Sequence, residues 1–176
     1  MEELMNIIKG RRATRIYENR EIPREDVKKI LEAGIWAPSG SNLQSWEFVV
    51  ILKNELIEKI KMISPGLFGN PTMLIIGCIN TERAKKGGKI GYPMAMMDVS
   101  MAFQNMMLMA YSLGIGSCPI LSFNKDALRE LLDIPEHIDP ILMVTFGYPS
   151  FWPNPPKRRS MEEVMHLDKF GRPFEE

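Results

Sequence analysis

The chain has 176 residues, 45% of them apolar, and its 22 basic and 22 acidic side chains cancel to a formal net charge of zero. This length and apolar content predict one globular domain, and the balanced charge excludes the broad positive surface of a general nucleic-acid-binding protein. No apolar run approaches the roughly 20 residues that span a bilayer, and the start MEELMNIIKG lacks the order of a secretory signal. We therefore expect a cytoplasmic protein with no nucleic-acid and no membrane partner.

The first half of the chain alternates between helical and extended patterns. Residues 4–10 predict a short helix that ends at a glycine, and residues 23–37 predict a proline-led helix that stops before the next proline. The run EFVVIL (47–52) and the run MLIIGCI (73–79) predict two buried strands in a sheet interior, and the segment between them, 54–63, predicts a helix.

The second half is dominated by one long apolar segment. Residues 93–113 contain no helix breaker after the first proline, and Met, Ala, Leu and Phe recur all around the helical period. This pattern predicts a helix on the order of 30 Å long that is buried on most faces. A strand at 116–120, a helix at 124–132 and a third long strand at 140–146 follow. The fold class is therefore α+β with a central sheet.

The composition changes after Gly147. The segment YPSFWPNPPKRRSMEEVMHLDKFG is too rich in proline for a regular element and too apolar for a free tail, which predicts an extended arm. Ser160 and Glu163 predict a capping box for one helical turn, and VMHL (164–167) predicts a short edge strand. The aromatic arm and the strongly apolar long helix together indicate an intertwined dimer.

Four isolated side chains are interpreted as structural. Cys78 and Cys118 are far apart and lie in apolar sequence, so we expect buried reduced thiols. Trp36 and Trp46 are expected in the core. The cysteines and the two histidines form no cluster with metal-ligand spacing, so no metal site is predicted.

The stretch RRATR, residues 11–15, places three arginines in five residues. One interpretation is a solvated surface cluster. The other is a phosphate site, because guanidinium forks match phosphate oxygens and keep their charge at any working pH. A second basic group, 157–159, lies in the arm. Neither glycine signature for nucleotides occurs, so a phosphate site would be built from side chains.

Several motifs in the same order resemble one family. RRATRIY, followed by PREDVKKILEAGIWAPSGSNLQSWEFVVI, resembles the N-terminal signature of the FMN-dependent nitroreductase family. DVSMAFQNMMLMAYSLGIGSCPI resembles the family's central dimer helix and following strand, and VTFGYP with PPKRRSMEEVMHLDKFG completes the match. The resemblance implies a nitroreductase-like fold with a central mixed or antiparallel sheet flanked by helices, in an intertwined homodimer. Residues 1–149 would form the FMN-binding domain, and residues 150–176 an exchanged arm that packs on the partner subunit.

The resemblance implies roles for the basic residues. Arg11 matches the position that binds the FMN phosphate, and Lys157 with Arg159 match the phosphate-binding cations of the arm. Arg15 matches a cation beside flavin N1 and O2, where negative charge accumulates on reduction, so it would tune the redox chemistry. Arg12 is either a further phosphate ligand or a solvated neighbour. No side chain is assigned as a catalytic acid, base or nucleophile.

The other implied cofactor positions surround the flavin ring. They are Pro38, Ser39, Ser41, Asn42 and Gln44 in a loop that reaches the flavin from the opposite subunit, Asn70 at the pyrimidine edge, and Pro119, Ile120 and Leu121 against the isoalloxazine.

The chain departs from the family pattern at four places, one of which is Ser45, in the position before Trp46 where the family usually has proline. Ala13 stands where many relatives have a hydroxyl residue, which removes a possible phosphate donor. Leu121 stands where some relatives have an acid, so no titratable group is expected above flavin N5, and this favours simple hydride transfer. The segment 82–93 is shorter than the insertion of larger members. Its KKGG sequence (85–88) is interpreted as a mobile basic turn, or alternatively as a site for an NADPH phosphate.

The resemblance implies an FMN-dependent oxidoreductase. A hydride would pass from NADH or NADPH through flavin N5 to a nitroaromatic, a quinone or a similar small acceptor, with ping-pong kinetics because one face serves both partners. The alternatives are the same fold with other flavin chemistry (dehalogenation, enoyl reduction or ferredoxin-linked reduction) and a non-catalytic FMN-binding or FMN-sensing protein. The sequence leaves the natural acceptor and the preferred donor open.

Overall fold

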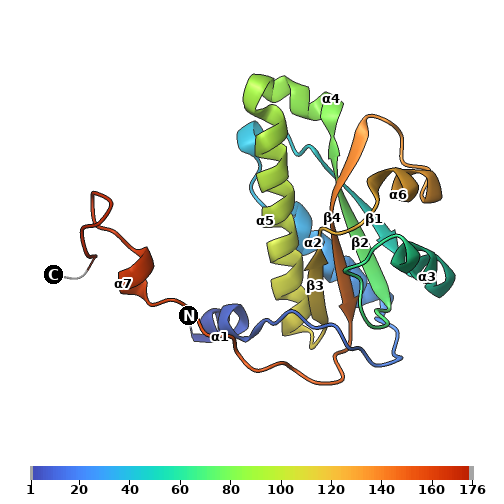
Figure 1. Ribbon diagram of the computed structural model, residues 1–176, viewed down its shortest axis with the longest axis horizontal. Coiled ribbons are helices and arrows are strands. Elements are labelled where there is room, and N and C mark those ends of the chain that lie inside the picture. The colour runs from blue at the N-terminus through green and yellow to red at the C-terminus, as the bar shows by residue number, and fades with distance from the viewer. Residues whose placement is uncertain (1, 175–176) are drawn as a thin grey trace.

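The computed structural model describes residues 2–174, which form a four-stranded sheet with helices on both faces (Figure 1). The strand order is β1 (Trp46–Ile51), β2 (Met73–Asn80), β4 (Ile138–Gly147), β3 (Gly116–Ile120). Each neighbouring pair is antiparallel. The expected α+β class is thereby confirmed, and the four strands form an antiparallel sheet rather than a mixed one.

Two helices cover each face of the sheet (Figure 1). α2 (Arg24–Ile35) and α5 (Gly91–Ser112) lie on one face, and α3 (Asn54–Met62) and α6 (Lys125–Leu131) lie on the other. The central strand β2 is apolar throughout because its alternate side chains enter the two different cores. Its predicted place in the sheet interior is confirmed.

Two expectations about apolar residues near β1 are wrong. Within residues 2–174, β1 pairs only with β2 and is an edge strand, with Glu47 exposed. Trp46 is buried as expected, whereas Trp36 is 78% exposed. Trp36 is the residue at which α2 ends, so its ring lies beyond the helix face that packs on the sheet and instead lines a shallow apolar groove with Leu4 and Met109.

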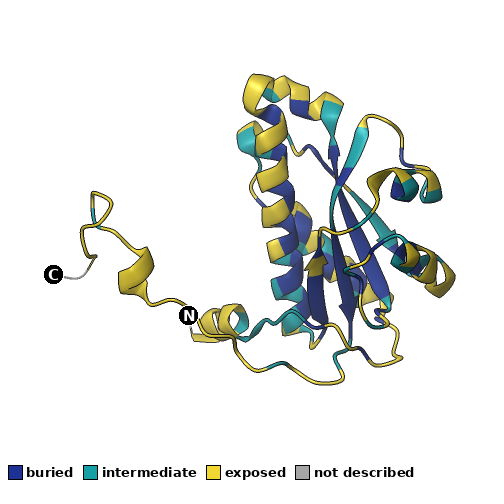
Figure 2. Cartoon of the chain, in the orientation of Figure 1, coloured by how far each residue is buried: buried dark blue, intermediate teal, exposed yellow. Residues whose placement is uncertain are grey.

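The long helix α5 starts at Gly91 and buries one side only, contrary to the expected burial on most faces. The buried side packs on the sheet and on α2, and Phe103 meets the ring of Phe48 edge to face at 5.7 Å. On the other side Met97 is 64% exposed, and Figure 2 shows this exposed stripe along the helix. The apolar residues therefore occupy both sides of the helix: one side is covered by the sheet and α2, and the other is exposed in the single chain.

Short elements complete the body of the molecule. α1 (Glu2–Gly10) packs on the C-terminal end of α5, and a Cβ atom at Gly10 would overlap the Tyr111 ring. The short helix η1 (Gly40–Asn42) precedes β1, and α4 (Thr81–Ala84) runs into η2 (Lys85–Ile90) before α5. The KKGG sequence lies in this 3-10 segment, which is kinked at Gly88, where φ is 64° and ψ is −143°.

The C-terminal arm leaves the body after β4. Its described residues are almost all exposed, and the segment that carries α7 (Met161–Val164) stands apart from the sheet in Figures 1 and 2. The capping box of Ser160 and Glu163 is confirmed. The expected edge strand at 164–167 is wrong, because only one isolated bridge, from His166 to Pro173, forms there. Residues 175–176 of the expected arm lie outside the described residues.

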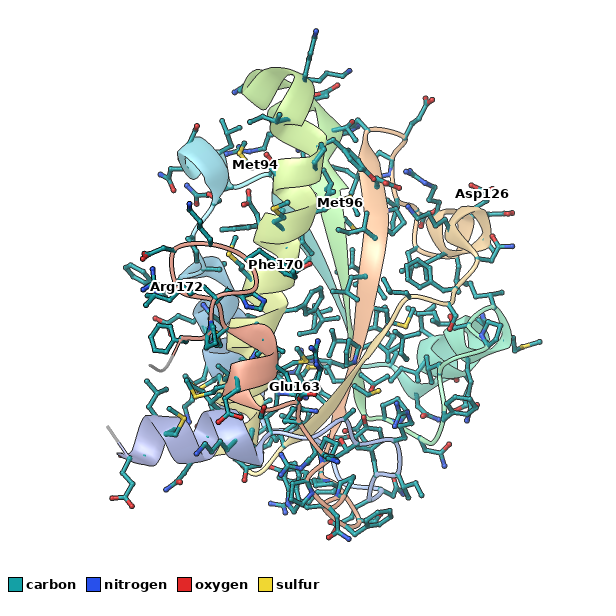
Figure 3. All side chains as sticks on the ribbon, turned by 60° about the vertical axis from the view of Figure 1, so that its left-hand side comes forward. Met94, Met96, Asp126, Glu163, Phe170 and Arg172 are labelled. Atoms are coloured by element: carbon teal, nitrogen blue, oxygen red, sulfur yellow. The ribbon has the colours of Figure 1, made fainter. Side chains whose placement is uncertain are left out.

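The tip of the arm folds on itself and displays an aromatic ring. Phe170 is 94% exposed and packs against the His166 ring at 4.4 Å, and Figure 3 shows it beside Arg172 at the end of the arm. Over residues 2–174, no helix has both the length and the apolar character that crossing a membrane requires.

Candidate cofactor-binding site

The RRATR segment lies along the edge strand β3. The Thr14 amide donates to the Ser117 carbonyl at 3.0 Å, and Ala13 forms an isolated parallel bridge with Ser117. Arg11 and Arg15 both lie close enough to Cys118 for their charges to act on its thiol: burial raises the pKa of Cys118, and the two guanidinium groups oppose that rise. The structure therefore brings the predicted N-terminal residues together with the predicted segment around Pro119.

Tyr17 locks this segment onto the sheet. Its hydroxyl donates to the Thr14 carbonyl at 2.6 Å and lies 2.7 Å from Thr145 Oγ1 of β4. The residue is 8% exposed, and burial raises the pKa of the Tyr17 phenol to about 12. The position of the arginines thus depends on a buried phenol.

We expect Tyr17→Phe to destabilise the protein by about 1–3 kcal/mol, because it leaves buried polar partners unpaired. The wild type should also lose stability above pH 10. The unfolded phenol ionises near pH 10 and the folded one near 12, so the folded state holds the proton more tightly and its advantage disappears as the pH rises through this window. Urea unfolding between pH 7 and 12 measures both effects, and Tyr17→Phe should have the flatter alkaline profile.

Tyr148→Phe is the matched control, since the Tyr148 hydroxyl has no hydrogen bond within residues 2–174. Its stability and alkaline slope should match those of the wild type. Equal slopes in Tyr17→Phe and the wild type would contradict the role of the buried phenol.

A small cavity of about 380 Å³ separates the end of α1 from the arm, and it gathers positive charge. Burial lowers the pKa of Arg11, and the charges of Arg12 and Arg158 lower it further. Among the described residues Arg11 forms no ion pair with a carboxylate. An arginine stays charged even so, so an anion would relieve this repulsion, and a phosphate group fits the donor set. The cavity is lined by Ile8, Lys9, Arg11, Arg12, Pro155, Pro156 and Arg158.

Three further cations of the two clusters differ in their contacts within this chain; Arg12 lines the cavity but its Nη1 is already engaged. Arg12 Nη1 donates to the carbonyls of Lys9 (2.5 Å) and Arg11 (2.8 Å) and so caps the C-terminal end of α1. Arg159 Nη2 donates to the Glu163 carbonyl at 2.9 Å. Lys157 is not among the residues that line the cavity. The structure thus places Arg158 beside Arg11, and places neither Lys157 nor Arg159 there.

The end of β3 offers an apolar surface beside these charges. Pro119 is exposed and Leu121 is 76% exposed, whereas Ile120 between them is 5% exposed and enters the core. The alternation puts Pro119 and Leu121 on the same side, where a flat ring could stack. Neither side chain titrates, so this surface supplies packing and backbone hydrogen bonds but no proton.

Asn70 and its neighbour Gly69 are both bound by Lys61, a residue that the sequence did not single out. Lys61 Nζ donates to Asn70 Oδ1 at 3.1 Å and to the Gly69 carbonyl at 2.8 Å. Gly69 has φ +69° and lies so close to Arg15 that a Cβ atom would be 1.9 Å from the Arg15 carbonyl oxygen. Because Lys61 takes the amide oxygen, the Asn70 NH₂ group remains free to donate. In sequence Lys61 resembles any surface lysine on the polar side of a helix, so no signal marks it.

The loop of residues 38–44 has a strained backbone. Ser41, Asn42 and Gln44 have φ values of 51°, 53° and 49°, a region that non-glycine residues rarely occupy and that clusters at functional sites. The Gly40 amide donates to the Asp98 carboxylate at 3.2 and 3.3 Å. Asp98 is 2% exposed, and burial raises the pKa of its carboxyl group while the Gly40 hydrogen bond opposes the rise. Nothing in the sequence marks Asp98, because it stands among the apolar residues that dominate α5.

This loop and the arginines lie at different ends of α5. Gly40 is bound to Asp98, whereas α1 ends against Tyr111. At 1.5 Å per residue the helix from Asp98 to Tyr111 spans about 20 Å. A single chain therefore does not bring the loop to the cavity beside Arg11.

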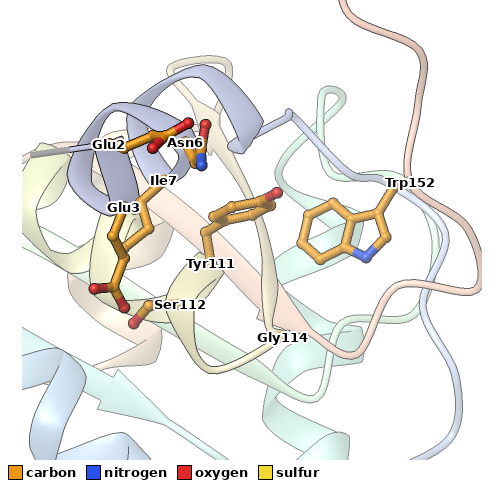
Figure 4. A pocket seen from close by; sticks show the side chains of 8 residues that line it. All are labelled: Glu2, Glu3, Asn6, Ile7, Tyr111, Ser112, Gly114 and Trp152. Atoms are coloured by element: carbon orange, nitrogen blue, oxygen red, sulfur yellow. The ribbon is translucent and has the colours of Figure 1, made fainter.

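A pocket of about 770 Å³ lies between α1, the end of α5 and the start of the arm (Figure 4). Trp152 and Tyr111 meet edge to face at 5.0 Å on its floor, and Glu2 and Glu3 stand at its rim. None of the predicted cofactor residues lines it. Within residues 2–174, no three side chains of His, Cys, Asp or Glu are grouped so that they could hold a metal ion.

The sequence and the fold are similar to those of known proteins. A profile of the Nitroreductase family matches residues 8–63 and 56–148. The chain is 39% identical over 157 residues to a protein of Archaeoglobus fulgidus (85% of this chain, 87% of the relative), and 33% identical over 175 residues to one of Methanothermobacter thermautotrophicus (96% and 88%); both are named "Putative NADH dehydrogenase/NAD(P)H nitroreductase". The solved structure of B. megaterium NfrA1 superposes with a TM-score of 0.87 at 21% identity, over 95% of this chain and 74% of that one. The chain belongs to the nitroreductase family.

Proposed function

We propose that the protein is an FMN-dependent NAD(P)H oxidoreductase that passes a hydride through flavin N5 to a nitroaromatic, a quinone or a similar small acceptor. The observation that carries this proposal is the packing of the RRATR segment along β3. It brings the charges of Arg11 and Arg15 close enough to act on Cys118, the residue that precedes the exposed Pro119. Positive charge beside a flat apolar surface suits a ring system that carries a phosphate.

The same geometry supports a homodimer with two composite sites. The 38–44 loop lies about 20 Å along α5 from the end of α1. A two-fold axis that sets two α5 helices antiparallel would bring the loop of one subunit to the arginines of the other. The exposed apolar side of α5 and the exposed arm, residues 150–174, supply surface for this assembly. In this arrangement residues 1–149 form the FMN-binding domain and the arm crosses to the partner.

Six of the predicted residues then have a defined physical role. Arg11, Lys157 and Arg159 hold the phosphate through charge-assisted hydrogen bonds. Arg15 places a fixed positive charge at the pyrimidine edge, and Asn70 donates its NH₂ group there because Lys61 holds its oxygen. Leu121 excludes water without offering a proton. When bound, FMN supplies the hydride-accepting and hydride-donating N5.

The names of the relatives support a nicotinamide donor. The two archaeal relatives are named for NADH and NAD(P)H, and another, from Staphylococcus saprophyticus, is an "NADPH-dependent oxidoreductase". Because one open face would serve donor and acceptor in turn, we propose ping-pong kinetics. Both cysteines are free, which suits the reducing cytoplasm.

The test is the visible spectrum of FMN-loaded protein under anaerobic conditions, before and after NADH or NADPH is added in separate cuvettes. Loss of the flavin bands within seconds, and their return when a nitroaromatic or quinone is added, would support the proposal. FMN that binds but stays oxidised with both donors would contradict the nicotinamide step. Protein that retains no FMN after gel filtration would contradict the cofactor.

A further inference from the structure

The segment that joins β2 to α5 carries a concentrated positive charge. Residues 81–90 contain four basic side chains and one acid, Glu82, although the chain as a whole is neutral. Lys85, Lys86 and Lys89 are exposed, and none of the three has an ion-pair or hydrogen-bond partner among the described residues. We call these three side chains the lysine turn.

The segment that carries the lysine turn is bound to the 38–44 loop. The fourth cation, Arg83, donates from Nε and Nη2 to the Leu43 carbonyl at 3.2 and 3.0 Å. A Cβ atom at Gly87 would lie 3.0 Å from Met94 and 3.4 Å from Leu43, so the turn packs directly on the loop and on the start of α5. Figure 3 shows Met94 in this upper part of α5. Arg83 therefore holds the segment against the 38–44 loop. The three lysine side chains remain free to bind a ligand.

In the proposed dimer this places the lysine turn at the mouth of the flavin site. The segment that carries the lysine turn packs against the same loop that would reach the partner's flavin. A dinucleotide that lays its nicotinamide ring on the flavin would extend its adenosine end outward over the rim. The lysine turn is a concentration of unpaired positive charge directly adjoining that loop.

We propose that the lysine turn binds the ribose 2′-phosphate of NADPH and makes NADPH the preferred donor. This inference rests on the proposed function and names its donor. NADPH and NADH differ only by that phosphate, which carries a charge of about −1.5 to −2 at pH 7 as other phosphate monoesters do. Lysine ammonium groups on flexible stems bind such a group as mobile point charges, without the fixed geometry that arginine imposes.

The first measurement is the rate of FMN reduction by each donor under anaerobic conditions, in wild type and in the triple variant Lys85→Gln/Lys86→Gln/Lys89→Gln. The lysines are exposed, so the variant should fold. We expect the wild type to be reduced at a lower concentration of NADPH than of NADH. The variant should need about 10-fold more NADPH, the size of one or two lost charge-assisted contacts, while its NADH dependence changes by less than about 2-fold. Added salt should weaken NADPH binding more than NADH binding in the wild type only.

The matched control removes the same charge elsewhere. Lys28, Lys53 and Lys59 are exposed on α2 and around α3, and their triple glutamine variant should keep the NADPH preference. If the control loses as much NADPH affinity as the lysine turn variant, the effect is general electrostatic steering and the proposal is overturned. Equal use of NADH and NADPH by the wild type also overturns it.

A second measurement tests phosphate binding at the lysine turn without any reduction of the flavin. Adenosine 2′,5′-bisphosphate and ADP are titrated into the FMN-loaded protein by calorimetry. The bisphosphate should bind more tightly than ADP, and only the lysine turn variant should lose this difference. Unchanged bisphosphate binding in that variant overturns the inference even if NADPH reduces the flavin. If neither donor reduces the flavin, the proposed function has failed, and the titration decides separately whether the lysine turn recognises the phosphate.

Discussion

Replacing Arg11 and Lys157 together with glutamine should remove bound FMN and leave the fold intact. Each cation is expected to contribute a charge-assisted contact with the phosphate, worth about 1.5–3 kcal/mol. We therefore expect the FMN affinity to fall by at least about 100-fold. Fluorescence titration of the apoprotein with FMN measures the affinity, and circular dichroism with gel filtration checks that fold and assembly survive.

Three single variants make this result specific. Arg12→Gln should leave FMN affinity within about 3-fold, because the Arg12 guanidinium caps α1 through the Lys9 and Arg11 carbonyls. Arg158→Gln distinguishes two arrangements of the arm, since Arg158 is the arm cation nearest to Arg11 within one chain. If Arg158→Gln lowers FMN affinity more than Lys157→Gln does, the assignment of Lys157 to the phosphate is wrong. Unchanged affinity in the Arg11 and Lys157 double variant would refute the phosphate site.

Gly69→Ala should be the most disruptive single-atom change near the site. The backbone of Gly69 is left-handed, with φ +69°, and the added methyl would lie 1.9 Å from the Arg15 carbonyl oxygen. The left-handed conformation costs about 1–2 kcal/mol for a residue with a Cβ atom, and the clash with backbone atoms cannot be relieved by turning a side chain. We expect a loss of about 3 kcal/mol or more, seen as a fall of about 6–12 °C in the thermal midpoint. FMN affinity should fall as well, because Arg15 or Asn70 must move.

Gly114→Ala is the matched control. Gly114 is also left-handed, with φ +74°, but a Cβ atom there would meet nothing within 4 Å. This variant should lose only the conformational cost of about 1 kcal/mol and keep its FMN affinity. If both alanine variants lose the same stability and both bind FMN normally, the close approach of Gly69 to Arg15 contributes neither to stability nor to FMN binding.

Most of the local structure could be predicted from residue pattern. The proline-led start of α2, the glycine that ends α1 and the capping box at Ser160 were all visible, because each depends on chemistry within a few residues. The apolar run of β2 indicated an interior strand for the same reason. Edge and interior could not be separated for β1, because strand order is a property of the whole sheet.

Apolar composition by itself did not tell which surface covers a side chain. Trp36 and the outer methionines of α5 have core-like chemistry, yet they are exposed in the single chain. The pattern shows that such residues favour burial, but burial requires an opposing surface, and this depends on the position of every other element or on a second subunit. Lys61 and Asp98 could not be identified from the sequence for the same reason. Each forms a hydrogen bond with a backbone group outside its own helix, and such a contact depends on the tertiary structure.

By itself the sequence determined the α+β class, the positions of most elements and the two groups of cations that indicate a phosphate. These depend on short-range periodicity and on residue chemistry, which are written directly in the chain. Only the tertiary structure decided which of those cations meet. It placed the RRATR segment on β3, Arg158 beside Arg11, and the 38–44 loop at the distant end of α5. The reason is geometric. The buried Tyr17 hydroxyl and the close approach of Gly69 fix the position of the RRATR segment, and the length of α5 separates that segment from the 38–44 loop. These contacts join residues that are distant in sequence, so the local pattern does not predict them.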